Sequence, residues 1–397
     1  GKTVYVANSS GSVAVINAAT NTVSATIVAG IPPWSAPMGG QPLGVAVSPD
    51  GTTVYVADYG SPNGSVPVIN AATNTVTTVI TDPTACMCVS NRSLNGPTGV
   101  AVSPDGKTVY VANSNGNSVS VINAATNTIT TTIELSFGGS AIGVAVSPDG
   151  KTVYVTENNI TVSVIDAATN TVTTEITGFV FSNKAAVSPD GKTVYVSNAG
   201  DTVSVIDATT NTVSGTVTVG LSPQFLAVSP DGKTVYVANR GDDSVSVIDA
   251  ATKTVTTITG VPRSNGVAVS PDGKTVYVSN AGFGTVTVIG AGVSGGNGTA
   301  AGKGGAGGTG GAALSGSAPG GAGGTGGGGG KGGNGDTAAA IPTSGGDGGK
   351  GGDGGNGATG TPAGGGGAGG KGGDGGNGAG GGANGAPGTP GTPGLPG

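Results

Sequence analysis

The chain has 397 residues, a formal net charge of −6, only 9% charged residues and no histidine. An acidic balance excludes a nucleic-acid-binding domain, which needs a basic surface to neutralise phosphates. The absence of histidine removes the commonest general base and the commonest metal ligand, so the composition argues against an enzyme and against a bound cofactor.

A nine-residue unit, Ser-Pro-Asp-Gly-Lys-Thr-Val-Tyr-Val, organises the chain and is complete at Ser103–Val111. A copy without its first residues opens the sequence at Gly1, so we expect the chain to be a fragment whose export signal could lie upstream. The aspartate of the unit recurs at positions 50, 105, 149, 190, 231 and 272. The last three intervals are all 41 residues, and a period of that size predicts a repeat architecture.

Each repeat contains four short β-strand patterns. In the most regular copy these are Leu226–Val228, Lys233–Val237, Ser244–Ile248 and Thr254–Ile258, all rich in β-branched residues. Between the first two lies Ser-Pro-Asp-Gly, in which proline presets φ, serine and aspartate bond the local backbone, and glycine tolerates a positive φ. Four strands joined by tight turns predict one antiparallel sheet, and a ring of such sheets is a β-propeller.

The strand patterns number seven for the second and third positions of the repeat but six for the first and fourth. The N-terminal repeat lacks its first strand and the C-terminal repeat lacks its fourth. We therefore predict an all-β, seven-bladed propeller over residues 1–290, with incomplete end blades. A gap is expected between residues 1–30 and 266–290, which a segment upstream of Gly1 would close.

The motifs Val109–Asn113, Val194–Asn198 and the repeated Ser-Pro-Asp-Gly resemble the YVTN family of β-propeller repeats. The resemblance covers residues 1–290 and implies the propeller fold. It implies little about function.

The loops sort onto two faces of the predicted ring. The Ser-Pro-Asp-Gly turns share a regular face, and the connections between blades and between second and third strands share an irregular face. Function tends to reside in variable loops on a rigid scaffold, so we expect ligand binding on the irregular face. The candidate binding residues are Trp34, Met38, Tyr59, Arg92, Phe181, Arg240, Asp242, Arg263 and Phe283. The alternative is that these are tolerated insertions whose aromatic rings cover the blade ends.

Other constellations are weaker. Cys86 and Cys88 are interpreted as two small apolar residues or a local disulfide rather than a metal or redox site. Arg240–Asp242 matches the Arg-Gly-Asp tripeptide of cell adhesion. The repeat already has Gly-Asp at this position, so a single arginine is enough to produce the match. Asp58 and Asp201, with Asp242 and Asp243, are interpreted as solvated loop acids, with a cluster at the channel mouth as the alternative.

Residues 291–397 form a second predicted region, in which roughly half of the residues are glycine and acids and bases balance. Such a composition predicts flexible coil, whereas its Gly-Gly-X triplets favour an extended threefold helix. This region resembles the glycine-rich domain of mycobacterial PE-PGRS proteins, although no PE domain precedes it. Residues 385–397 are collagen-like triplets, too few for a triple helix. Asp353 and Asp374 lie in segments close to a calcium-binding nonapeptide that lack its large apolar residue, so calcium is a weak expectation.

Taken together, these features predict a non-enzymatic cell-surface or secreted protein. Its propeller would bind a protein or glycan, and its glycine-rich region would act as an envelope or spacer element. No transmembrane run is present in the sequence. The alternative is a propeller enzyme or small-ligand binder, lactonase-like, with a site at the channel mouth.

Overall fold

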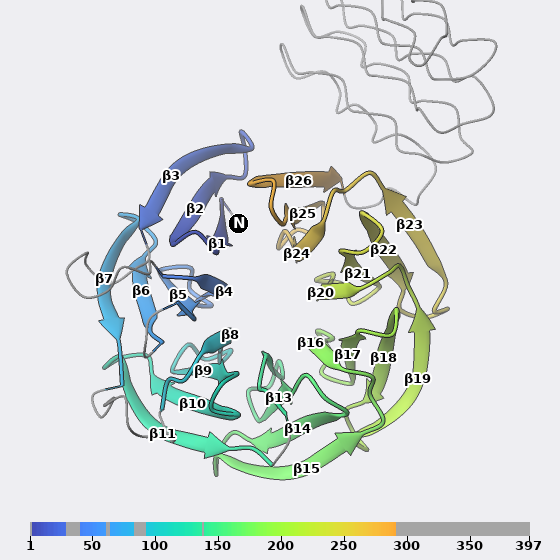
Figure 1. Ribbon diagram of the computed structural model, residues 1–397, viewed down its shortest axis with the longest axis horizontal. Coiled ribbons are helices and arrows are strands. Elements are labelled where there is room, and N and C mark those ends of the chain that lie inside the picture. The colour runs from blue at the N-terminus through green and yellow to red at the C-terminus, as the bar shows by residue number, and fades with distance from the viewer. Residues whose placement is uncertain (1, 29–39, 61–63, 83–92, 137–138, 291–397) are drawn as a thin grey trace, which may run out of the picture. The chain divides into compact units, whose positions relative to one another are not determined.

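The computed structural model describes the chain except residues 1, 29–39, 61–63, 83–92, 137–138 and 291–397. In the described residues the strands form seven antiparallel sheets, which confirms the predicted all-β, seven-bladed propeller (Figure 1). The propeller unit comprises Gly1–Val255 and Pro262–Val288, and a second unit comprises Thr256–Val261 and Ile289–Gly397. The predicted domain boundary at residue 290 stays a prediction.

Blades are numbered along the chain, and each is written from its innermost strand outward. Blade 1 holds β1 (Thr3–Asn8), β2 (Ser12–Asn17) and β3 (Thr22–Val28). Blade 2 holds β4 (Pro42–Val47), β5 (Thr53–Asp58), β6 (Val66–Asn70) and β7 (Thr75–Ile80). Blade 3 holds β8 (Pro97–Val102), β9 (Thr108–Asn113), β10 (Ser118–Asn123) and β11 (Thr128–Glu134). Blade 4 holds β12 (Gly143–Val146), β13 (Thr152–Thr156), β14 (Thr161–Asp166) and β15 (Thr171–Thr177).

The remaining blades follow the same order. Blade 5 holds β16 (Ser182–Val187), β17 (Thr193–Asn198), β18 (Thr202–Asp207) and β19 (Thr212–Thr218). Blade 6 holds β20 (Pro223–Val228), β21 (Thr234–Asn239), β22 (Ser244–Asp249) and β23 (Val255–Thr259). Blade 7 holds β24 (Ser264–Val269), β25 (Thr275–Asn280) and β26 (Thr285–Gly290). In Figure 1, β4, β8, β16, β20 and β24 lie nearest the centre of the ring, whereas β3, β7, β11, β15 and β19 lie at the rim.

The Ser-Pro-Asp-Gly turn closes the hairpin between the first two strands of each complete blade. In blade 3, Ser103 Oγ donates to Asp105 Oδ1 at 2.6 Å and accepts from Thr108 N at 2.9 Å. Gly106 has a φ of 72°, the left-handed conformation that glycine adopts without steric cost. The hydrogen bond from Ser103, ahead of that from the Lys107 amide, lowers the pKa of Asp105. The turn therefore has the structural role that the sequence predicts.

The hydrophobic core lies between blades. Tyr110 on β9 packs, with Val119 and Ile133 of its own blade, against Val153 and Ile165 of the next blade. The same arrangement recurs between blades 1 and 2, 2 and 3, 4 and 5, and 5 and 6. Side chains alternate between the two faces of a strand, so each sheet contributes one apolar face to each neighbour. This explains why the strands are apolar at nearly every position.

The end blades are incomplete, as predicted. Blade 1 has no strand inside β1, and blade 7 has no strand outside β26 among the described residues. The burial of β1 reflects this difference. Val4 and Val6 on β1 are partly exposed, whereas the corresponding Val54 and Val56 on β5 are fully buried.

Candidate functional site

The predicted binding residues separate into several places. Trp34, Met38 and Arg92 lie outside the described residues, as do Cys86, Cys88, Asp353 and Asp374. The others are Tyr59, Phe181, Arg240, Asp242, Arg263 and Phe283, and all of them lie on the predicted irregular face. They do not all converge on one site, because Tyr59 comes from blade 2 and the other five come from the adjacent blades 5, 6 and 7.

Tyr59 follows β5 and packs against the neighbouring blade. Its side chain is partly buried, and its hydroxyl donates to Asn115 Oδ1 at 3.4 Å. A Cβ added to Gly96 would lie 2.9 Å from the Tyr59 ring, so the ring covers this glycine closely. Tyr59 therefore links blades 2 and 3 rather than standing free as an anchor.

Arg263 and Phe283 lie near each other on blade 7. The carbonyl of Arg263 accepts from Ala281 N at 2.9 Å, and its guanidinium lies 3.3 Å from a Cβ added to Gly282. Phe283 follows directly and is 58% exposed. The pair combines one polar and one exposed apolar side chain, as the sequence predicts for a binding surface, but it involves only two of the predicted residues.

The loop acids hold the segments that connect blades. Asp242 accepts from Leu221 N at 3.1 Å and from Ser244 Oγ at 2.7 Å. Asp201 accepts from Ser222 N at 2.8 Å, and Asp243 accepts from Arg263 N at 2.6 Å. The interpretation of these residues as solvated loop acids is therefore incomplete, because each one bonds a backbone amide of an inter-blade segment.

An exposed apolar patch covers the irregular face of blades 4 to 6. We define it by Ile160, Val180, Phe181 and Leu221, which are 52–61% exposed. Phe179 N donates to the Ile160 carbonyl at 3.3 Å, and Ala199 N donates to the Val180 carbonyl at 3.0 Å. The segment of Leu221 is joined to the same loops through Ser222 N, which donates to Asp201 Oδ1 at 2.8 Å. Only Phe181 was predicted from sequence. The signal for the others was an apolar side chain at a loop position where other repeats carry polar residues or glycine.

The inner strands carry a site that the sequence reasoning missed. Four of the six begin their Gly-Val-Ala-Val segment with glycine, but blades 5 and 6 have Lys184 and Phe225 at this position. A Cβ added to the corresponding Gly99 would lie 2.9 Å from the Ile142 carbonyl oxygen, which shows how tightly the inner strands approach. The break in the repeat at Lys184 was the signal available in the sequence.

Lys184 extends along the inner edge of the ring. Its Nζ donates to the Ile142 carbonyl and lies 5.0 Å from the centre of the Phe225 ring. Part of the side chain remains accessible, but protein atoms surround it closely, and this burial lowers the pKa of Lys184 to about 8. A neutral fraction near physiological pH would allow Lys184 to act as a base or nucleophile.

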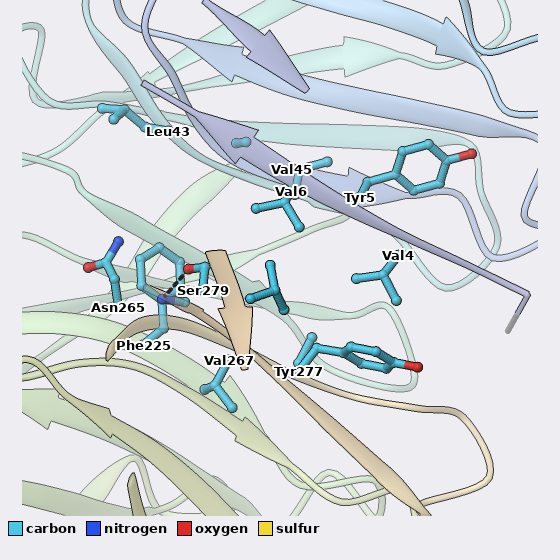
Figure 2. A pocket seen from close by; sticks show the side chains of 14 residues that line it. Val4, Tyr5, Val6, Leu43, Val45, Phe225, Asn265, Val267, Tyr277 and Ser279 are labelled. Atoms are coloured by element: carbon cyan, nitrogen blue, oxygen red, sulfur yellow. Dashed lines mark hydrogen bonds between the residues drawn. The ribbon is translucent and has the colours of Figure 1, made fainter. Parts of the chain in front are cut away.

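A cavity of about 190 Å³ lies at the seam between blades 7 and 1. Figure 2 shows Val4, Tyr5 and Val6 of β1 on one side, Val267 and Tyr277 of blade 7 on the other, and Phe225 with Asn265 toward one end. Ser279 Oγ accepts from Gly266 N at 2.9 Å (Figure 2). The described residues that line it are mostly apolar, and none of them is charged.

A groove of about 650 Å³ lies on the regular face between blades 3 and 4. Asp105, Asp149 and Asp166 line it, together with Lys151. Each of these carboxylates already accepts hydrogen bonds within its own turn. Among the described residues no group of three or more potential ligands is placed to hold a metal ion.

Two buried acids occupy a position that is asparagine in five blades. Asn113 at this position donates from Nδ2 to Ser120 Oγ at 2.8 Å. Asp58 replaces it in blade 2, is fully buried, and accepts from Gln41 N at 2.6 Å and from Ser65 Oγ at 3.3 Å. Burial raises the pKa of Asp58, and burial likewise raises that of Glu157 in blade 4. Asp58 is therefore not the solvated acid that the sequence suggested. It is buried at the end of β5, where its carboxylate accepts hydrogen bonds from neighbouring segments.

Asp58→Asn is expected to raise the free energy of unfolding at pH 7 by about 0.5–2 kcal/mol, because it removes a buried charge and keeps the acceptor oxygen. For an acid whose folded pKa is raised, the cost of the charge is present above the folded pKa and disappears as pH falls below the ordinary value near 3.8. The gain should therefore vanish in acid, as measured by denaturant unfolding from pH 3 to 7. Asp105→Asn is the control. Because the pKa of Asp105 is lowered, this substitution should reduce the free energy of unfolding at pH 7 instead of raising it. A loss of stability in Asp58→Asn at pH 7 would contradict the argument.

Comparison with known proteins supports the fold. A family model described as "Lactonase, 7-bladed beta-propeller" matches residues 158–259, which is less than half of the chain. The search of curated proteins found no match. Many solved chains match, among them one from the hydrazine synthase of Kuenenia stuttgartiensis, which is 25% identical with a TM-score of 0.54. That alignment covers 63% of this chain and 76% of the other. The finer resemblances to YVTN repeats and to PE-PGRS glycine-rich regions stay predictions.

Proposed function

We propose that the chain is a non-enzymatic binding scaffold at the cell surface or outside the cell, with the apolar patch on blades 4 to 6 as its contact surface. The observation that carries the proposal is the exposure of Ile160, Val180, Phe181 and Leu221 on one face of the propeller. Large apolar side chains gathered on one surface mark interaction sites more often than isolated exposed residues do. The glycine-rich residues 291–397 would serve as an envelope or spacer element.

The chemistry of the described residues supports binding over catalysis. The acids of the irregular face bond backbone amides, and the buried acids Asp58 and Glu157 lie inside blades. The patch is apolar at its centre and is flanked by the exposed Arg240 and Asp242. An apolar centre with a polar rim fits a protein partner better than a glycan. Among the described residues no helix is long and apolar enough to cross a membrane.

The test compares two surface variants in binding to the envelope fraction of the producing cell. Val180→Ser with Phe181→Ser and Leu221→Ser should weaken binding of the labelled protein at least tenfold, because the apolar contacts are lost. The control is Val23→Ser with Val213→Ser, which removes exposed valines from the outer strands β3 and β19. Equal binding by both variants, or recovery of the protein only from cytosol, would overturn the proposal.

A second candidate is a lactonase-like enzyme or small-ligand binder. Two observations favour it: the family match over residues 158–259, and the presence of Lys184 beside Phe225, which lines the seam cavity. The amine of Lys184 would act as the base on a substrate bound at the inner edge of the ring, beside the Ile142 carbonyl. The same preparations can be incubated with a panel of lactones. Hydrolysis that Lys184→Met abolishes and the patch variant retains would favour this candidate over the first.

A further inference from the structure

Two of the three glutamates in the chain meet on one face of blade 4. Glu157 follows β13, and Glu175 lies on β15, where it is the cross-strand partner of Ser163. Ser163 Oγ donates to the Glu157 carboxylate, so this hydroxyl lies between the two acids. In blade 3 the corresponding positions hold the neutral residues Asn113 and Thr132. Among the described residues, blade 4 is the only blade with an acid at both positions.

The two carboxylates have no basic partner in the part of the chain that the structure describes. Glu157 is 1% exposed, whereas Glu175 lies at the surface. Burial raises the pKa of Glu157, the hydrogen bond from Ser163 lowers it, and the charge of Glu175 raises it further. The ion pairs of the described residues join lysines to aspartates of their own turns, and none includes a glutamate. A buried carboxylate is costly unless a cation or hydrogen bonds compensate for it, so this pair favours a bound cation.

Two segments of blade 3 bring further oxygen atoms to the pair. Ser136 follows β11, and its Oγ donates to the Glu175 carboxylate. Asn117 lies in the loop between β9 and β10, and its Nδ2 donates to the Ser136 carbonyl at 2.6 Å. The Asn117 side chain also donates to the Glu157 carboxylate. The Asn117 amide therefore lies against both Glu157 and Ser136, at the junction of blades 3 and 4.

The carbonyl oxygen of this amide has no donor. Asn117 Oδ1 is buried and accepts no hydrogen bond. The hydrogens of the side chains around it are already used, because Ser136 and Ser163 donate to carboxylates and the Asn117 amide donates to Ser136 and Glu157. The other asparagines with such an oxygen occupy two positions that recur along the repeat, namely Asn74, Asn127 and Asn170 before an outer strand, and Asn113, Asn198, Asn239 and Asn280 at the end of a second strand. Asn117 belongs to neither position, and around it oxygen atoms outnumber donors, as they do around a hard metal cation.

We propose that Glu157, Glu175 and Asn117 bind a calcium ion between blades 3 and 4, through the two carboxylates and Asn117 Oδ1. Calcium prefers carboxylate and carbonyl oxygens, tolerates irregular geometry and completes its ligand set with water. The site has two acids rather than a group of three, so neutral oxygens supply the remaining ligands. The ion balances the charge of the buried Glu157 and ties the loop of Asn117 to the outer strand of blade 4.

The experiment uses the full chain, freed of metal with a chelator and titrated with calcium chloride at pH 7 by calorimetry. Wild type should bind with a dissociation constant of about 10⁻⁴–10⁻³ M, as extracellular calcium modules do, and magnesium should bind at least tenfold more weakly. Calcium should also raise the midpoint of thermal unfolding, because it binds only the folded state. Glu157→Gln should weaken calcium binding at least tenfold. Glu175→Gln, which changes an exposed position and leaves the fold intact, should do the same.

The third glutamate provides the matched control. Glu134 lies on β11 opposite Ser118, on the face of blade 3 that carries Asn113, and Glu134→Gln should change calcium binding less than twofold. Absence of calcium binding to wild type, or equal binding by Glu157→Gln, would overturn the proposal. Binding that is lost in Asp353→Asn with Asp374→Asn but kept in Glu157→Gln would assign calcium to the glycine-rich region instead. A difference in stability between wild type and Glu157→Gln that follows pH and not calcium would show that the cluster takes up a proton, and would equally overturn the calcium site.

Discussion

Tyr110→Ala should lower the free energy of unfolding by about 3–5 kcal/mol, in the range of large-to-small substitutions in a packed core. Tyr110 is 2% exposed and joins blades 3 and 4 through contacts with Val119, Val153 and Ile165. Its loss leaves a cavity between two complete sheets. Little relaxation can fill this cavity, because β9 is paired on both sides, with β8 and with β10.

Tyr5→Ala is the matched control and should lower the free energy of unfolding by only about 1–2 kcal/mol. Folding buries less apolar area of Tyr5 than of Tyr110, so less is lost when the side chain is removed. Tyr5 holds the same position in its repeat but borders the cavities at the seam. Denaturant unfolding followed by circular dichroism measures both variants. Equal losses would mean that Tyr5 is as well packed as Tyr110, and the seam would then not be the weak point of the ring.

Lys184→Met is expected to raise the free energy of unfolding at pH 7 by about 2 kcal/mol. This is less than the free energy that corresponds to the whole pKa shift, because the side chain is partly accessible to solvent. Methionine keeps an apolar stem beside Phe225 and removes an ammonium that burial disfavours. The unfolded lysine titrates near pH 10.5 and the folded one near pH 8. Between these values the unfolded chain holds a proton that the folded chain has released, so stability of the wild type rises with pH.

The advantage of Lys184→Met should therefore be full below pH 8 and disappear above about pH 10.5. Unfolding midpoints of both proteins between pH 6 and 11 measure it, and taking the difference cancels the titration of the tyrosines. Lys107→Met is the control, because that side chain is 82% exposed and its removal should change little. A constant difference across the pH range would show that the ammonium of Lys184 is not desolvated.

The candidate sites were less predictable than the fold. The aromatic residues Phe181 and Phe283 stand out in the sequence because the repeats around them are so uniform, and both are exposed in the structure. Ile160 and Leu221 gave a weaker signal, since a single aliphatic residue in a loop can point in either direction. The sequence does not single out Lys184, because a charged residue in a strand is usually solvated. Its contacts with Ile142 and Phe225 in the structure show the opposite.

The sequence by itself determined the number of blades, the strand order within each blade, and the two missing strands. These features follow from local rules: period-two apolar strands, a Ser-Pro-Asp-Gly turn that bonds itself, and a count of strands along the chain. The tertiary structure decided the environment of single side chains. Whether Asp58 is solvated or buried, whether Lys184 is free or enclosed, and whether Tyr5 is packed depend on atoms from other blades that lie tens of residues away in the chain. The repeats made the scaffold predictable. The burial and contacts of the residues that depart from the repeat could be known only once their neighbours in space were known.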